Sequence, residues 1–253
     1  MGPTDPRQSG VIDLDALNVF ARERMLRTDS GQPLRFVDAR TAPPGAYERI
    51  VTQTGCVPTR THGPGMLHDW FNALSWLAFP LAKRRLNAVH ADAMPPTGVA
   101  ARRGRVRDVA TLLDESGAAF LCRNERLREA FVERDWTTLF VHERASFVRD
   151  VRVVVFGHAS FEKLLAPFKS ICAHALVLPS PRRPADDEYA IVAAVDAALA
   201  DALRLERMAQ LRLHPLPLLG VPGWCDANED PSWYDDEAVF RRTRGAAARA
   251  GDR

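Results

Sequence analysis

A histidine and a glutamate that follow a buried strand are the residues of this chain best placed to do chemistry. Val153 to Phe156 form a short apolar run typical of a strand covered on both faces, and Gly157 permits a sharp turn. The next residues suit a helix ending at Pro167, with His158 in its first turn and Glu162 on the same face. A neutral histidine there could act as a general base or a metal ligand. The alternative is that both side chains only satisfy local backbone groups and the helix dipole.

A second polar group lies on the helix expected at 66–80. The apolar residues of this segment recur at helical spacing and make a core face. His68 and Asn72 are four residues apart and share a different face, beside Asp69. Asp69 could belong to a site, or it could only cap the helix.

These residues could assemble either a general acid–base site or a metal site. In the acid–base site the catalytic residues would be His158, Glu162, Asp69 and His68. In the metal site a divalent ion would be bound by His158, His174 and His68. Arg107, Asn72 and Arg60 would bind the substrate. The predicted reaction is hydrolysis or group transfer on a small anionic molecule.

A non-catalytic binding or regulatory module is the alternative to an enzyme. Its polar residues would only stabilise turns, and its C-terminal segment would contact a partner through Trp224, Trp233 and Tyr234. The chain lacks the H-E-x-x-H, G-x-S-x-G, P-loop and G-x-G-x-x-G patterns, which argues against the common zinc proteases, serine hydrolases and nucleotide-binding folds. A net charge of +2 disfavours a dedicated nucleic-acid or membrane binder.

Length and composition predict an ordinary globular protein. The chain has 253 residues, of which 46% are hydrophobic and 26% are charged. We expect a disordered N-terminus over 1–12, a single globular domain over 13–241 and a disordered tail over 242–253. Four scattered cysteines indicate neither a disulfide framework nor a zinc knuckle, so the expected location is the cytoplasm. The chain shows no signal peptide, and its most apolar window is too short to span a bilayer.

The pattern of elements predicts an α+β fold, predominantly helical, with a small mixed or antiparallel sheet. A regular helix is expected at 186–211, and a helix at 81–93 carries Asn87 and His90 on one face. A hairpin is expected at 109–122 with D-E-S-G at its tip, so that Asp114 and Glu115 would be turn residues rather than site residues. Strands near 152–156 and 174–178 would complete the sheet.

Six ordered segments are more specific than these patterns. They are P-L-R-F-V with Y-E-R-I, G-C-V-P-T-R, H-D-W-F-N-A-L-S-W-L-A-F-P, R-D-V-A-T-L-L-D-E-S-G-A, F-G-H-A-S-F-E-K-L-L-A-P, and L-P-L-L-G-V-P-G-W with Y-D-D-E-A-V-F-R. From about Leu34 to Arg241, the chain thereby resembles a proteobacterial family of domains of unknown function, number three thousand and twenty-five in that series. The resemblance implies a single cytoplasmic bacterial domain, but no activity and no functional residues. Ser160 and Phe161 stand where the family pattern has a leucine-rich pair.

Overall fold

The computed structural model describes residues 3–94, 104–179, 187–208 and 210–242. Within these ranges the helices are α1 (Pro6–Ser9), α2 (Leu14–Glu23), α3 (Tyr47–Thr54), α4 (Met66–Ala78), α5 (Pro80–Asp92), α6 (Arg105–Ser116), α7 (Glu125–Glu133), α8 (Arg144–Asp150), α9 (His158–Lys163), α10 (Glu188–Ala202) and α11 (Leu205–Met208). The strands are β1 (Arg35–Asp38), β2 (Cys56–Thr59), β3 (Gly117–Cys122), β4 (Val151–Val155), β5 (Cys172–Pro179) and β6 (His214–Pro217). Shorter helical turns are η1 (Thr138–His142), η2 (Leu218–Gly220), η3 (Asp226–Glu229) and η4 (Pro231–Asp235).

The strands form two small sheets. The larger has the order β4-β3-β5-β6, in which β3 runs antiparallel to β4 and parallel to β5, and β6 runs antiparallel to β5. The smaller pairs β1 with β2 in parallel. A helix-rich chain with a mixed sheet confirms the α+β prediction.

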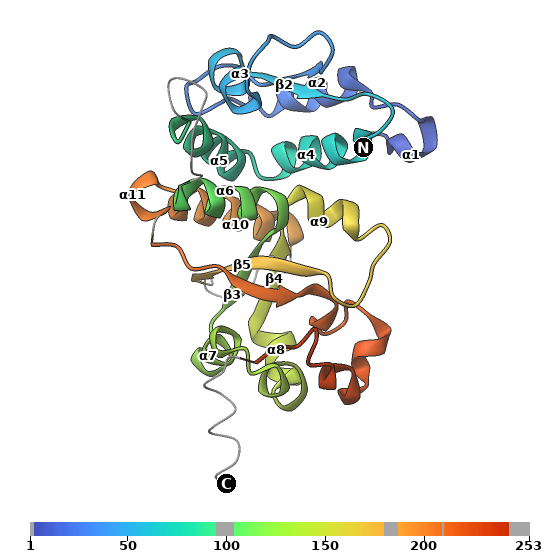
Figure 1. Ribbon diagram of the computed structural model, residues 1–253, viewed down its shortest axis with the longest axis vertical. Helices are drawn as coiled ribbons and strands as arrows, with labels where there is room; N and C mark the ends of the chain where they lie inside the picture. Colours follow the sequence, from blue (N-terminus) through green and yellow to red (C-terminus); the bar gives the residue numbers. More distant parts are fainter. Residues whose placement is uncertain (1–2, 95–103, 180–186, 209, 243–253) are drawn as a thin grey trace.

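Helices cover one face of the larger sheet in successive layers (Figure 1). Helices α6, α9 and α10 lie next to the sheet, and α4 and α5 stack on them. Helices α2 and α3 and the β1–β2 pair form the layer farthest from the sheet, while α7 and α8 lie on the opposite side. The N-terminal segment 1–12 was expected to be disordered, but its described part contains helix α1 and the buried side chain of Ile12. Residues 243–253 of the expected C-terminal tail lie outside the described residues. No helix in the described ranges has the length and apolarity needed to cross a bilayer.

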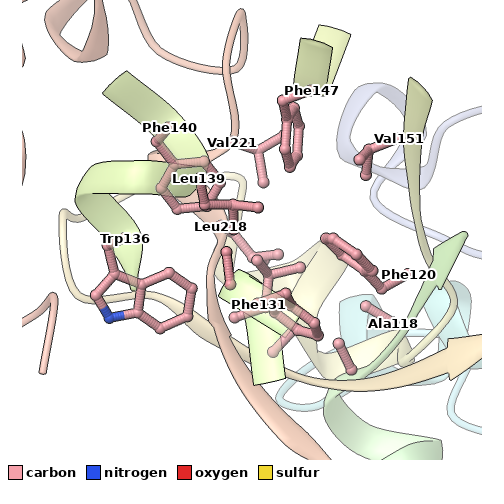
Figure 2. Close-up of a cluster of buried hydrophobic side chains, with 14 of the residues drawn as sticks. Ala118, Phe120, Phe131, Trp136, Leu139, Phe140, Phe147, Val151, Leu218 and Val221 are labelled. Atoms are coloured by element: carbon pink, nitrogen blue, oxygen red, sulfur yellow. The ribbon is translucent and has the colours of Figure 1, made fainter. Parts of the chain in front are cut away.

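The core on the α7 and α8 side of the larger sheet contains stacked aromatic rings among aliphatic side chains (Figure 2). The rings of Phe120 and Phe131 stack with their centroids 4.0 Å apart, and Phe140 stacks on Trp136. Phe120 comes from the central strand β3, whose six residues are all buried. This core anchors β3, so the helix that precedes the strand is placed against a rigid support.

The prediction of a hairpin over 109–122 is wrong. Residues 105–116 form helix α6, and its buried side chains Val109, Ala110 and Leu113 recur at helical spacing. The D-E-S-G segment therefore ends a helix instead of turning a hairpin, and Gly117 begins the strand that follows. Arg105 and Arg107 belong to the first turn of α6. The arginines at 102 and 103 lie outside the described residues.

The strand, turn and helix expected around Gly157 are confirmed, except that the helix ends at Lys163 and not at Pro167. Strand β4 ends at Val155, and helix α9 begins at His158 with Gly157 as its N-cap. The backbone φ of Gly157 is −68°, so the glycine is required for space rather than for its conformation. A Cβ at this position would lie 2.2 Å from the backbone nitrogen of Gly117. The end of α6 and the start of α9 thus touch through two glycines.

Replacing Gly157 with alanine is expected to lower the free energy of unfolding by about 3 kcal/mol, because the backbone of the central strand would have to move. The matched control is Gly104→Ala, since an added Cβ there meets nothing within 4 Å in the described part of the chain. Urea unfolding of the two variants measures the difference. Equal stabilities would show that the two junctions do not pack as closely as described.

Helix α5 is held at its first turn by a side chain from a distant helix. Its first residue is Pro80, which suits that position because no backbone N–H is needed there. The buried carboxylate of Asp196 on α10 accepts hydrogen bonds from the backbone N–H groups of Leu81 and Ala82, at 3.0 and 2.7 Å. This contact orients α5 over α10, and the face carrying Lys83, Asn87 and His90 turns toward α3 and α4.

Candidate functional site

A cavity of about 440 Å³ opens between the N-terminal layers and the helices on the sheet. Residues from α3, β2, α4, α5, α6 and α9 line it. Its polar lining residues are Tyr47, Glu48, Arg60, His68, Asp69, Asn72, Lys83, Asn87, His90, Asp114, Glu115 and His158. A cavity with so many convergent polar groups is the natural candidate for a functional site.

Two histidines and a glutamate meet at one end of this cavity. The Nε2 atoms of His68 and His158 lie 3.1 Å apart, and Glu115 Oε2 lies 3.7 Å from His158 Nε2. One ligand atom from each of the three residues falls within 4.8 Å of the others, close enough for all three to bind one metal ion. Two histidines and one glutamate are also a ligand set of catalytic zinc sites.

Three helices bring these side chains together. Helix α4 buries Trp70, Ala73 and Trp76 in the N-terminal core, which leaves His68 on another face. Glu115 lies in the last turn of α6 and His158 in the first turn of α9. The close approach of the glycines after and before these two turns places the glutamate beside the histidine.

Burial lowers the pKa of His158 to about 4, and the charge of Lys83 acts in the same direction. The imidazole is therefore neutral at physiological pH, the form that binds metals. Its Nδ1 is buried and lies 4.0 Å from Asp114 Oδ2. Burial and the neighbouring Asp114 charge raise the pKa of Glu115.

Glu162 contacts the outer side of the histidine pair. Its Oε2 lies 3.3 Å from His68 Nδ1, the ring nitrogen opposite the one that faces His158. A carboxylate in this position fixes the tautomer of a histidine and leaves its Nε2 lone pair for a metal. In a metal site of this kind, Glu162 would position His68 rather than bind the ion.

Replacing Glu162 with glutamine is expected to weaken Zn²⁺ binding about 10-fold, because losing the partner of a metal-bound histidine typically has an effect of this order. Competition with a chromophoric chelator measures the affinity. Glu129→Gln on α7, an exposed glutamate outside the cavity lining, is the matched control and should leave it unchanged. A Glu162→Gln protein with unaltered affinity would remove Glu162 from the site.

Lys83 is a buried cation in the lining of the cavity. Its Nζ donates to Asp114 Oδ1 at 2.5 Å and to Asn72 Oδ1 at 2.8 Å, and it lies 5.6 Å from the centroid of the Trp76 ring. Burial alone would raise the pKa of Asp114, but the charge and the hydrogen bond of Lys83 help to hold that pKa below its ordinary value. The ion pair therefore links α5 to the end of α6 that carries the candidate ligands.

Tyr47 on α3 also lines the cavity. It accepts hydrogen bonds from Asn72 Nδ2 at 2.9 Å and from Trp76 Nε1 at 3.2 Å. Burial raises the pKa of Tyr47, so the phenol keeps its proton at physiological pH. In the chain of hydrogen bonds from Lys83 through Asn72 to Tyr47, the donor and the acceptor of each bond are therefore defined.

Arg60 and Asp69 form an ion pair at the rim. The guanidinium of Arg60 contacts both carboxylate oxygens of Asp69, at 2.9 and 2.7 Å, and its backbone N–H donates to the same side chain. Helix α4 starts after Gly65, so Asp69 does not cap it. Asp69 instead ties α4 to the end of β2.

Acidic side chains outnumber basic ones in this cavity. Among the described residues that line it, the acidic ones are Glu48, Asp69, Asp114 and Glu115, and the basic ones are Arg60 and Lys83. Each of the two basic groups already contacts a carboxylate. The balance favours a bound cation over a free anion.

The comparisons with known proteins place this chain in a family. A family model described as a protein of unknown function, DUF3025, matches residues 34–244. The chain belongs to this family. No curated protein and no solved structure matches it. The match confirms the resemblance seen in the sequence, and every cavity residue lies inside the matched region. The proteobacterial source and the cytoplasmic location stay predictions.

Of the site residues predicted for this DUF3025 chain, most come together. His68, Asp69, Asn72, Arg60 and His158 line the cavity, and Glu162 contacts His68. His174 and Arg107 are not among the described lining residues. His174 on β5 lies 2.8 Å from Ser116 Oγ through its Nδ1. Arg107 lies in the first turn of α6, at the end opposite Glu115, with its Nε buried and unpartnered in the described ranges.

Sequence reasoning missed Glu115, Asp114, Lys83 and Tyr47. The helical spacing of Val106, Val109, Ala110 and Leu113 was the available signal that 105–116 is a helix, which would have put the two acidic residues at its end. Lys83 is one of three lysines in an arginine-rich chain and lies one turn before Asn87 on the same face. Nothing in the local sequence around Tyr47 indicates a site.

The aromatic residues proposed as a partner surface are mainly structural. Tyr234 is buried and donates to the carbonyl of Gly220, and Trp233 packs on the same core and donates to the carbonyl of Leu219. Trp224 is 40% exposed. Tyr234 and Trp233 therefore pack on the core, and Trp224 is the ring of the three that is more exposed.

Proposed function

We propose that this DUF3025 chain is a metal-dependent hydrolase whose divalent ion is bound by His68, His158 and Glu115. The observation that carries the proposal is the convergence of these three side chains at the end of a polar cavity. Catalytic zinc sites use three protein ligands and leave a fourth position for water or substrate. Here the cavity supplies the space for that fourth position.

The distances fit such an ion with little adjustment. Two nitrogens bound tetrahedrally at about 2.0–2.1 Å from zinc lie roughly 3.3 Å apart. The two Nε2 atoms already lie 3.1 Å apart. Glu162 supplies the outer carboxylate that such histidines usually contact.

A bound ion would acidify a water molecule and produce a hydroxide at neutral pH. His68, His158 and Glu115 would hold the ion, and the activated water that it would supply is the nucleophile that hydrolysis requires. Among the chain's own residues, Glu162 would orient His68, and the polar lining of the cavity would bind the rest of the substrate.

A small anionic substrate is still expected, but the group that would bind its charge differs from the arginines predicted from the sequence. Arg107 is not on the described lining, and Arg60 and Lys83 are paired with carboxylates. An anionic group would therefore bind to the metal ion rather than to arginine. The cavity volume suits a molecule of small metabolite size.

Metal content and metal-dependent hydrolysis test the proposal. The purified protein is stripped with a chelator, reloaded with Zn²⁺, Mn²⁺ or Co²⁺, and assayed on nitrophenyl esters, nitrophenyl phosphates and nitroanilides. We expect one ion per chain, and hydrolysis that disappears on stripping and returns on reloading. A protein that binds no ion at micromolar concentrations would refute the metal centre. Hydrolysis that survived stripping would favour a metal-free acid–base site built on the same histidines.

A further inference from the structure

The part of the cavity between α3 and α5 carries two hydrogen-bonding groups whose directions the protein fixes. They are the Tyr47 hydroxyl and the Asn87 side-chain oxygen, and both residues line the cavity. Hydrogen bonds connect Tyr47 through Asn72 and Lys83 to Asp114, whose Oδ2 lies 4.0 Å from His158 Nδ1. A substrate that fills this cavity would contact both residues.

Tyr47 can only donate to a ligand. The ammonium of Lys83 has no lone pair, so the Asn72 atom it contacts must be the oxygen, and the Asn72 amide nitrogen must face Tyr47. The Trp76 indole nitrogen is likewise only a donor. Both lone pairs of the Tyr47 oxygen are therefore used, and its proton is left for another acceptor. No acceptor for this proton is found among the described residues.

Asn87 can only accept from a ligand. Its Nδ2 donates to the carbonyl oxygen of Glu48 at 3.1 Å and to Thr52 Oγ1 at 2.8 Å. A carbonyl oxygen cannot donate, so the amide cannot be flipped. Its Oδ1 is buried and has no hydrogen-bond partner within the described ranges. An acceptor left in this state costs free energy, which a ligand N–H would recover.

We propose that Tyr47 and Asn87 form a recognition subsite for a neutral carboxamide group of the substrate, whose oxygen accepts from Tyr47 and whose N–H donates to Asn87. This inference rests on the proposed hydrolase, since the metal holds the other end of the substrate. A carboxylate or phosphate ester has no proton to give to Asn87. The nearby charges of Asp114 and Asp69 also disfavour an anion beside Tyr47. A carboxamide accepts through its oxygen and donates through its nitrogen. It can therefore accept a hydrogen bond from Tyr47 and donate one to Asn87 at the same time.

A matched ligand series tests the subsite on the zinc-loaded protein. Malonamate, succinamate and glutaramate each carry one carboxylate for the metal and one primary amide at increasing distance. Their N,N-dimethylamides lack the N–H donors, the corresponding dicarboxylates replace the amide by a charge, and ω-hydroxy acids place donor and acceptor on one oxygen. Calorimetry gives the dissociation constants. For at least one chain length we expect the primary amide to bind about 10-fold more tightly than its dimethyl analogue, as for one hydrogen bond to a buried acceptor.

Two variants separate the roles of the residues. Asn87→Ala should abolish the preference for the primary amide over the dimethylamide. Tyr47→Phe should weaken both amides by a similar factor and leave their ratio unchanged, because both carry the oxygen. Tyr189→Phe, whose ring is exposed on α10, should change nothing. If Asn87→Ala does not fold, Tyr47→Phe still tests the assignment. An unchanged ratio of the dissociation constants of the two amides leaves the N–H with Asn87, and a changed ratio would assign the N–H to Tyr47.

Failure of the subsite and failure of the hydrolase give different results. If zinc binds and no chain length prefers the primary amide, the subsite is wrong while the metal centre stands. Equal or tighter binding of the hydroxy acids would assign it to a hydroxyl instead. If zinc does not bind, the metal centre is wrong, and acetamide and N,N-dimethylacetamide are compared by the shifts they cause in the Asn87 side-chain amide NMR signals. Equal shifts would overturn the subsite in that case too.

Discussion

His158→Ala and His68→Ala are each expected to weaken Zn²⁺ binding by at least about 100-fold. Each substitution removes one of three ligands, and loss of an outer partner alone already costs about 10- to 100-fold. His158 is buried beside Asp114 and Lys83, whereas the side chain of His68 is partly exposed, so His68→Ala perturbs folding less. Competition with a chromophoric chelator measures the affinities, and circular dichroism verifies that both variants are folded.

The sharpest control for this prediction is His174→Ala. The sequence favours His174 as a ligand, but in the structure it contacts Ser116 and does not belong to the His68–Glu115–His158 group. Its removal should leave Zn²⁺ affinity within about 2-fold of the parent. His142→Ala provides a second control at an exposed histidine. A loss in His174→Ala as large as in His158→Ala would show that the metal is bound elsewhere.

Asp114→Ala is expected to lower the free energy of unfolding by about 3–5 kcal/mol, because it leaves the Lys83 ammonium buried without its counter-charge. Asn72 would remain as a neutral partner and could not replace the carboxylate. Urea denaturation at neutral pH measures the effect. The comparison is Glu125→Ala, which breaks an exposed pair with Arg128 and should cost at most about 1 kcal/mol.

A double variant distinguishes a buried charge from a lost contact. Lys83→Met combined with Asp114→Ala removes the stranded charge, so the double variant should be more stable than Asp114→Ala alone. If the single change cost no more than Glu125→Ala, the ion pair would be solvated, and its role in joining α5 to α6 would be refuted. The same variants assayed for zinc separate stability from metal binding.

Local patterns were sufficient for some elements and misleading for others. The sequence around His158 predicted a strand, a turn and a helix from an apolar run, a glycine and a proline. This prediction succeeded because these signals depend only on neighbouring residues. The segment 109–122 carries a turn signal, D-E-S-G, that can end a helix as readily as it can turn a hairpin. Pairing decided the outcome, since β3 joins β4 and β5, which come later in the chain, instead of folding back on 109–113.

The amino-acid sequence by itself determined the fold class, the family, the helix faces that carry His68 and Asn72, and the position of His158 at the start of a helix. The tertiary structure alone decided which polar residues meet. His68 and His158 are ninety positions apart, and Lys83 and Asp114 are thirty-one apart. Such contacts depend on how helices pack, which periodicity does not specify. Two glycines that let α6 and α9 touch brought Glu115 to the histidines, and His174, equally suitable by residue type, was placed against Ser116.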